Sequence, residues 1–282
     1  LGTLSRKKGD QSRWGAFEDD PVRYYCPPWE RDVDESFVTE SKVPTWDPLL
    51  NPGTIIKRPT DGASVAGLKG SSYGNDYFVG EGQIETENME GDDSRIIMDR
   101  AIPFIQKAVD RDLPFLAVIW FHTPHSPVVG GDKYRTMYKE HPEDTQHYYA
   151  CVTAMDEQVG RLRSTLSELG VADNTMVWFC SDNGPARQGS PRHVGSPGHL
   201  SGYKLSIQEG GIRVPGLLVW PDQIKQPITI SEPCVTSDYF PTILSSLGID
   251  LPDDRIYDGI DLWPLIRGQS KERTKPIGFL NK

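Results

Sequence analysis

The segment VWFCSDNGP, residues 177–185, passes abruptly from an apolar run to a carboxylate, a carboxamide and a Gly-Pro turn. Asp182 and Asn183 place two oxygen donors on adjacent residues, which suits a hard divalent cation such as calcium. A calcium shell takes about 6–8 oxygen atoms, so other ligands would have to come from elsewhere in the protein. An Asp-Asn pair before glycine is also an ordinary turn former, because both side chains bond to their own backbone. Taken alone, the pair is compatible with a metal site or with a turn cap.

Two histidines follow a second apolar run, in the segment FHTPHSP at residues 121–127. On residue type alone, His122 and His125 could be histidines satisfied in the core or caps of a loop. Their position directly after an expected strand, between prolines that restrict the backbone, also suits side chains aimed at a ligand. Both interpretations stay open on these residues alone.

A glycine-rich loop at residues 195–211 carries a single lysine, Lys204. Most lone lysines are solvated surface groups, but one flanked by glycines can fold inward as a compact positive charge for an anion. At the exit of the loop, Glu209 and Arg213 are interpreted as a structural ion pair or a backbone clamp. Lys204 is therefore the candidate anion ligand of this loop.

Composition limits the class of protein that could carry these groups. The chain has 282 residues, 37% of them hydrophobic and 25% charged, which is typical of a soluble globular protein with a substantial core. A net charge of −10 argues against a nucleic-acid surface, and no apolar stretch approaches the roughly 20 residues that span a bilayer. The cysteines have no CxxC spacing and are expected to be unpaired: Cys26, Cys151, Cys180 and Cys234.

The elements that would position the polar clusters alternate between helix and strand. Helices are expected from Asp93, where Pro103 would kink or delay the helix, over 149–169 with Gly170 as its stop, and over 239–247 behind the capping pair Ser237-Asp238. The apolar stripe of the second helix would consist of Tyr149, Val152, Met155, Val159, Leu162, Leu166 and Leu169. Buried strands are expected over 114–121, 175–180 and 214–220. This order predicts an α/β layered domain with a mostly parallel central sheet, whose strand ends would present both polar clusters on one face.

Seven segments in order resemble the sulfatase family of the alkaline-phosphatase-like fold, over roughly residues 114–268. They are FHTPHSP, YYACVTAMDEQVGRL, NTMVWFCSDNG, GHLSGYK, EGGIRVPGLLVWP, SDYFPTILSSLG and DGIDLWPL. The resemblance implies that Asp182 and Asn183 help to hold one calcium ion and that His125 and Lys204 contact the sulfate group. It also implies that this chain contains the fold in a form incomplete at both ends.

The departures from the family pattern concern the nucleophile. Family members carry a Cys-x-Pro-x-Arg or Ser-x-Pro-x-Arg motif whose first residue becomes formylglycine. The nearest match here begins at Cys26 but has Glu30 in place of the arginine, and it is interpreted as a decoy. The resemblance therefore implies that an N-terminal part outside this sequence supplies the nucleophile and further calcium ligands, and that this fragment alone is inactive. The family's small C-terminal domain would be cut off near Phe279.

The function implied by the resemblance is hydrolysis of a sulfate ester of a carbohydrate or an aryl alcohol, outside the cytoplasm. Two alternatives stay open: a phosphodiesterase or phosphonate hydrolase of the same fold, and a non-catalytic binder of sulfated glycans. The expected organisation is a loop-rich segment over 1–90, a main α/β domain over 91–270 and the start of a C-terminal subdomain over 271–282. Within the first segment, residues 24–47 are expected to line or cover the pocket.

Overall fold

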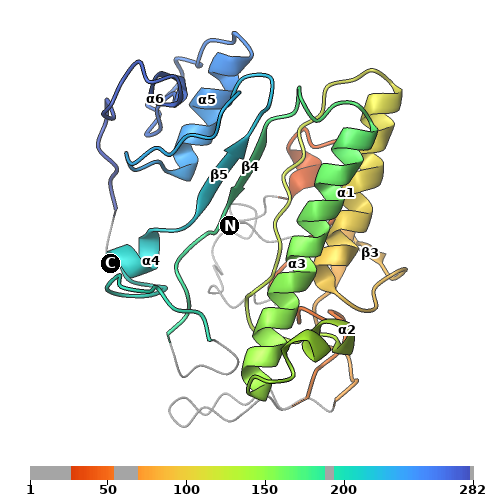
Figure 1. Cartoon of the computed structure of the whole chain (residues 1–282). Coiled ribbons are helices and arrows are strands. Elements are labelled where there is room, and N and C mark those ends of the chain that lie inside the picture. Colours follow the sequence, from red (N-terminus) through yellow and green to blue (C-terminus); the bar gives the residue numbers. More distant parts are fainter. Residues whose placement is uncertain (1–26, 54–68, 188–193, 280–282) are drawn as a thin grey trace, which may run out of the picture. The chain divides into compact units, whose positions relative to one another are not determined.

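The computed structural model describes residues 27–53, 69–187 and 194–279 (Figure 1). The chain divides into two compact units. The first contains Leu1–Thr175 and Phe179–Gly216, and the second contains Met176–Trp178 and Leu217–Lys282. The expected boundaries at residues 90 and 270 remain predictions.

Two long helices of the first unit pack side by side, α1 (Asp93–Asp110) and α3 (Glu143–Glu168) (Figure 1). The side chain of Asp92 accepts a hydrogen bond from the Arg95 backbone N–H at 3.1 Å and so caps α1. Pro103 lies on the exposed side of α1, which begins at Asp93 and continues past the proline, so Pro103 does not delay the helix. The buried face of α1 consists of Ile96, Met98, Ile102, Ile105 and Ala108.

The buried face of α3 differs from the predicted stripe. Of the predicted residues only Leu166 is fully buried, and Tyr149 is exposed. The residues that are buried are mostly smaller or polar: His147, Ala150, Cys151, Ala154, Gln158, Thr165 and Leu166. At Ala150 a close approach explains the small side chain, because a Cβ on Gly130 would lie only 2.4 Å from the Cβ of Ala150. The end of α3 matches the prediction, since Gly170 follows it with a φ of +71°.

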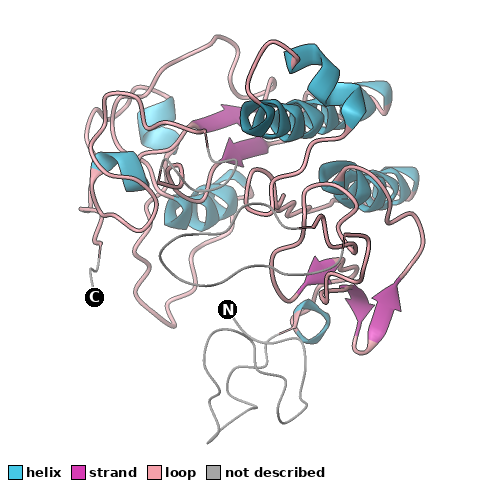
Figure 2. Cartoon of the chain, turned by 90° about the horizontal axis from the view of Figure 1, so that it is seen from below, coloured by secondary structure: helices cyan, strands magenta, loops and turns pink. Residues whose placement is uncertain are grey.

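Part of the segment expected to be loop-rich forms a small antiparallel sheet, visible beside the helices in Figure 2. Its order is β1 (Val38–Thr39), β2 (Tyr77–Gly80) and β3 (Gln83–Glu85), with Thr39 opposite Tyr77 and Tyr77 opposite Glu85. The sheet packs onto the start of α1 through a cluster of Val43, Tyr77, Met89 and Ile96. Four shorter elements complete this unit: η1 (Pro28–Glu30), α2 (Asp132–Arg135), η2 (Thr136–Tyr138) and α4 (Glu209–Ile212).

The apolar run Pro114–Phe121 is not a buried strand, which corrects the prediction. Its backbone is irregular, and within the described part of the chain no strand pairs with it. Alternate side chains face solvent, with Leu116 73%, Val118 67% and Trp120 78% exposed. A strand is buried on both faces only when other elements cover both sides of its sheet, and this apolar run belongs to no sheet of the described residues.

A two-stranded sheet of β4 (Val177–Cys180) and β5 (Gly216–Val219) contributes Val177–Trp178 and Leu217–Val219 to the second unit. The predicted burial of both strands was wrong, since β4 is half-buried throughout and β5 is largely exposed. The described residues form only these two small sheets, so the mostly parallel central sheet remains a prediction. The helices of this unit are η3 (Thr236–Asp238), α5 (Tyr239–Ser246) and α6 (Trp263–Ile266).

A buried ion pair connects the start of α5 to a later segment of the second unit. The guanidinium of Arg273 donates to both carboxylate oxygens of Asp238, at 2.7 and 3.0 Å. The same carboxylate accepts the backbone N–H groups of Val235 at 2.8 Å and Ile260 at 2.9 Å. The prediction that Asp238 caps α5 was therefore wrong, because its side chain makes no capping hydrogen bond to this helix. The carboxylate connects three segments of the chain.

Candidate active site

The turn that contains Asp182 and Asn183 lies directly against the glycine-rich loop, backbone to backbone. The N–H of Gly184 donates to the carbonyl of Gly211 at 2.8 Å. A Cβ on Gly184 would lie 1.9 Å from the carbonyl oxygen of Gly210, so only glycine allows this approach. The N–H of Lys204 donates to the carbonyl of Pro185 at 2.9 Å, which fixes the lysine beside the same turn.

The loop that carries the histidines is held by a buried carboxylate. Asp93 is fully buried and accepts from Nδ1 of His122 at 2.9 Å, while Nε2 of His122 lies 3.0 Å from the Thr39 hydroxyl. Tyr77 also donates to Asp93. His122 is therefore a satisfied structural histidine, one of the two interpretations that the sequence left open.

His125 is positioned by the backbone of the same loop. Its N–H donates to the carbonyl of His122 at 2.6 Å, and its Nδ1 lies 2.7 Å from the carbonyl oxygen of Ser126. Because a carbonyl only accepts, Nδ1 carries the proton and Nε2 is the unprotonated nitrogen of the neutral ring. His125 thus has Nε2 available to receive or, once protonated, to donate a proton.

The electrostatic surroundings of His125 include two of the other predicted residues. Although the His125 side chain is exposed, desolvation by the surrounding atoms is the largest cause that lowers its pKa below the ordinary value, and the positive charges of Lys204 and Lys42 act in the same direction. The hydrogen bond to Ser126 and the carboxylate of Asp182 oppose this shift. His125, Lys204 and Asp182 therefore share one electrostatic environment within the first unit.

Sequence reasoning missed Lys42, which lies in the aperiodic N-terminal segment and follows no motif. Its segment does contact the histidine loop, since Thr45 donates its hydroxyl to the carbonyl of Val129 at 2.8 Å. The backbone N–H of Thr45 donates to the carbonyl of Pro127 at 3.1 Å. The expectation that residues 24–47 line or cover the pocket remains a prediction, and residues 24–26 lie outside the described part. No local pattern marks Lys42, because it acts electrostatically on His125 across 83 residues of sequence.

Replacing Lys42 by methionine should raise the pKa of His125 in the calcium-free chain, because one of the positive charges that disfavour the imidazolium is removed. The titration can be followed by NMR of the His125 ring signals. Lys139→Met is the matched control, since Lys139 is an exposed lysine of the same unit that does not contribute to the pKa of His125. An unchanged His125 pKa in Lys42→Met, or an equal rise in the control, would contradict this placement.

Asp182 and Asn183 can supply part of a calcium shell. Asp182 is exposed, and Nδ2 of Asn183 donates to the carbonyl of Gly184 at 2.8 Å, which leaves the Asn183 Oδ1 available to a cation. Among the described residues no group of three or more His, Cys, Asp or Glu side chains could hold a metal ion. The two oxygens therefore fit a site that needs further ligands, as the sequence predicted for a shell of about 6–8 oxygens.

The remaining sequence interpretations have clear outcomes where the structure describes them. Glu209 and Arg213 form the expected ion pair, with 3.1 Å between Oε2 and Nη1 on the surface of α4.

Three of the four cysteines are free thiols, Cys151, Cys180 and Cys234, whereas Cys26 lies outside the described residues. No helix in the described ranges is long and apolar enough to cross a membrane.

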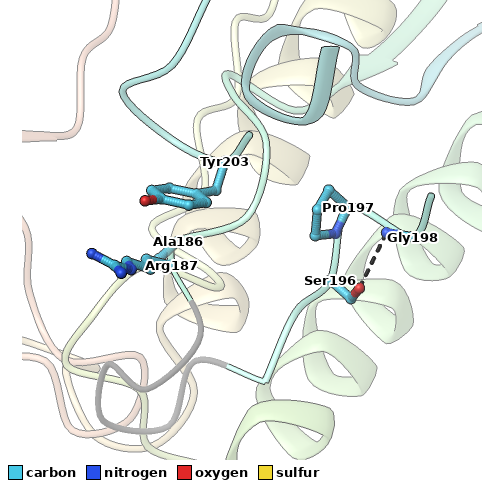
Figure 3. Close-up of a pocket in the computed structure, with 6 residues that line it drawn as sticks. All are labelled: Ala186, Arg187, Ser196, Pro197, Gly198 and Tyr203. Atoms are coloured by element: carbon cyan, nitrogen blue, oxygen red, sulfur yellow. Dashed lines mark hydrogen bonds between the residues drawn. The ribbon is translucent and has the colours of Figure 1, made fainter. Parts of the chain in front are cut away.

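A cavity of about 360 Å³ opens between the segment that follows the DNG turn and the glycine-rich loop (Figure 3). It is lined by Ala186, Arg187, Ser196, Pro197, Gly198 and Tyr203. Arg187 lies three residues after Gly184 of the DNG turn, and Tyr203 directly precedes Lys204. The lining of the cavity is therefore close in sequence to both candidate site segments.

Comparison with known proteins agrees with the motif order. A sequence model described as Sulfatase matches residues 34–249. Steryl-sulfatase of Rattus norvegicus is 39% identical over 168 residues, which are 56% of this chain and 27% of that protein. N-acetylgalactosamine-6-sulfatase of Mus musculus is 32% identical over 197 residues, 70% of this chain and 37% of that protein. The chain thus spans about a third of the length of these relatives.

Solved structures give the same result for the fold. The structure of Ps i-CgsB in complex with k-i-k-neocarrahexaose has a TM-score of 0.60 and 29% identity, covering 69% of this chain and 41% of that one. The PsFucS1 sulfatase from Pseudoalteromonas sp. has a TM-score of 0.52 and 27% identity, covering 66% and 38%. The family model covers most of the chain and the neighbours share its α/β fold. This chain therefore belongs to the sulfatase family.

Proposed function

We propose that the whole protein hydrolyses a sulfate ester and that His125, Lys204, Asp182 and Asn183 belong to its active site. The observation that carries this proposal is the shared electrostatic environment of His125, Lys204 and Asp182, which come from three separate family motifs. Their side chains supply a proton carrier, a fixed positive charge and a metal-binding carboxylate. These are the groups that transfer of a charged sulfuryl group requires.

Lys204 and His125 would act on the ester itself. As the bond between sulfur and the bridging oxygen breaks, the alcohol oxygen leaves with the electron pair and must be neutralised by a proton. The ammonium of Lys204 would stabilise the charge that develops on this oxygen. His125, protonated on Nε2 when the sulfate anion is bound nearby, would deliver the proton, while its Nδ1 stays bonded to Ser126.

Asp182 and Asn183 would hold one side of a calcium ion, with the remaining ligands supplied by other parts of the protein. When bound, calcium would withdraw charge from the sulfuryl oxygens, and formylglycine in a part outside this sequence would supply the attacking hydroxyl. The whole protein would also complete the mostly parallel central sheet and act outside the cytoplasm, as the family resemblance implies.

A carbohydrate sulfate is the favoured substrate class. One relative is named for N-acetylgalactosamine and one structural neighbour is in complex with neocarrahexaose, an oligosaccharide by its name. Another relative is named for a steryl sulfate, so an aryl or alkyl alcohol is the second choice. A phosphodiesterase of the same fold and a binder without a nucleophile are the alternatives, and release of sulfate, but not phosphate, by the full-length protein separates them.

Asp182→Ala in the full-length protein should lower calcium affinity and sulfatase activity together. Removing a carboxylate from a cation site leaves the ion poorly neutralised, and the adjacent amide of Asn183 cannot replace the charge. Calorimetry of calcium binding and release of sulfate are the two measurements.

Asp173→Ala is the control for Asp182→Ala, because Asp173 is an exposed carboxylate before β4 that belongs to no site residue group. This variant should keep both properties. Unchanged calcium binding in Asp182→Ala would reduce the Asp-Asn pair to a turn cap.

A further inference from the structure

The cavity beside the candidate site has two chemically different walls. Figure 3 shows the Tyr203 ring and Arg187 on one side and the segment Ser196-Pro197-Gly198 on the other. The guanidinium carbon of Arg187 lies 5.7 Å from the centroid of the Tyr203 ring, within the range of a cation–π contact. One wall is therefore a cationic and aromatic pair that faces open space.

Arg187 differs in its partners from five other arginines of the first unit. Arg95, Arg100, Arg135, Arg161 and Arg213 each form an ion pair with a carboxylate. Arg187 is exposed, and among the described residues no carboxylate lies within ion-pair distance of it. Its guanidinium retains planar donors that can bind a carboxylate or a sulfate in bidentate fashion.

Tyr203 gives the same wall a flat apolar surface. An aromatic ring offers its face to the C–H groups of a sugar ring, and its hydroxyl remains available to a hydrogen bond. Ser196 turns its hydroxyl inward to accept the N–H of Gly198 at 3.1 Å, which fixes the opposite wall. A cavity of about 360 Å³ is within the range of ligand sites, which are usually about 300–1,000 Å³.

The chain places this wall next to the reacting groups. Tyr203 precedes Lys204 directly, so their Cα atoms are about 3.8 Å apart. Arg187 lies two residues after Pro185, whose carbonyl accepts the N–H of Lys204 at 2.9 Å. A substrate whose ester oxygen reaches Lys204 would therefore extend naturally along the wall.

We infer that Arg187 and Tyr203 form a subsite for a second anionic group of the substrate, a carboxylate or a further sulfate on a sugar. The ligand class is a carbohydrate with more than one negative charge, and the inference rests on the proposed function. Tyr203 packs against the sugar ring, and Arg187 binds the anionic group that is not cleaved. Both residues determine specificity and neither takes part in bond breaking.

The experiment uses the full-length protein, the variant Arg187→Gln and three substrates. 4-Nitrophenyl sulfate carries one anion, a disulfated disaccharide carries a second sulfate, and a monosulfated disaccharide with a uronic acid carries a carboxylate. Arg187→Gln should raise KM for one or both two-anion substrates by about 10- to 100-fold, the typical loss for a charge-assisted bidentate pair, with kcat nearly unchanged. Kinetics on 4-nitrophenyl sulfate should not change.

The same set of measurements identifies the anion and controls for structural damage. A larger effect on the disulfated substrate assigns a sulfate, and a larger effect on the uronic acid assigns a carboxylate. Arg187→Lys should recover part of the lost affinity, because it restores the charge but not the planar donors. Arg111→Gln, at an exposed arginine after α1, should leave all three substrates unaffected.

Two outcomes would overturn the inference. One is an unchanged KM for every two-anion substrate in Arg187→Gln, and the other is an equal loss on 4-nitrophenyl sulfate. If the unmutated protein releases no sulfate at all, the proposed function fails instead. Calorimetric binding of the disulfated disaccharide to both proteins then decides the subsite independently, with weaker binding to Arg187→Gln expected and equal binding contradicting it.

Discussion

Replacement of Lys204 by alanine in the full-length protein should lower kcat by about 100- to 1,000-fold, the typical loss for one donor that stabilises developing charge. The reason is that negative charge grows on the bridging oxygen as the ester breaks, so the ammonium contributes more in the transition state than in the ground state. The loss in kcat/KM should be at least as large. The pKa of His125 should also rise, because Lys204 is one of the charges that lower it.

The dependence on the leaving group distinguishes this role from simple binding. The deficit should shrink for aryl sulfates with acidic leaving alcohols, because such oxygens need little stabilisation. Steady-state kinetics on a series of alkyl and aryl sulfates measures this trend, and calcium content should stay normal, unlike in Asp182→Ala. Lys139→Ala serves as the control at an exposed lysine. Full kcat of Lys204→Ala on a poor alkyl leaving group would return Lys204 to the surface-lysine interpretation.

Arg273→Met should destabilise the second unit by about 3–5 kcal/mol, the usual cost of breaking a buried ion pair from one side. Asp238 is fully buried and the Arg273 side chain is only 6% exposed, so the substitution leaves a carboxylate in the interior with two backbone N–H donors alone. The free energy of unfolding can be measured by urea denaturation. Hydrogen exchange at the Ile260 amide reports the loss locally, because this N–H donates to Asp238.

A matched surface pair provides the control for Arg273→Met. Arg255 and Asp254 have the same 2.7 Å separation but are 69% and 51% exposed, so Arg255→Met should have little effect. The double variant Asp238→Leu/Arg273→Met should recover stability relative to Arg273→Met, since no buried charge remains. Equal stability of Arg273→Met and Arg255→Met would show that burial does not set the strength of this pair.

The pH dependence of this pair follows from the pKa of Asp238. Burial alone would raise that pKa, but the hydrogen bonds from Arg273 and from the backbone N–H groups of Ile260 and Val235 outweigh it and hold the pKa below the ordinary 3.8. A carboxyl group with a lowered pKa stabilises the folded state above its unfolded pKa, and this contribution is lost as the pH falls through the folded pKa. The pair therefore contributes fully at neutral pH and fails only in acid.

The sequence by itself determined the local features of this protein. The presence of helices α1, α3 and α5 and the stop at Gly170 were predicted correctly, because apolar spacing and turn formation depend on residues close together in the chain. The order of seven motifs was enough to identify the sulfatase family. The motifs also marked His125 and Lys204 as residues to test, since their types and surroundings can be read directly.

Only the tertiary structure decided which side chains are buried and which distant groups meet. The small side chain of Ala150 on α3 matches the close approach of Gly130, and the exposure of Leu116 follows from the lack of a paired strand in the described ranges. Lys42 acts electrostatically on His125 across 83 residues of sequence, and Arg273 contacts Asp238 across 35 residues. Such contacts depend on how elements pack, and no local pattern of hydrophobicity or turn residues contains that information.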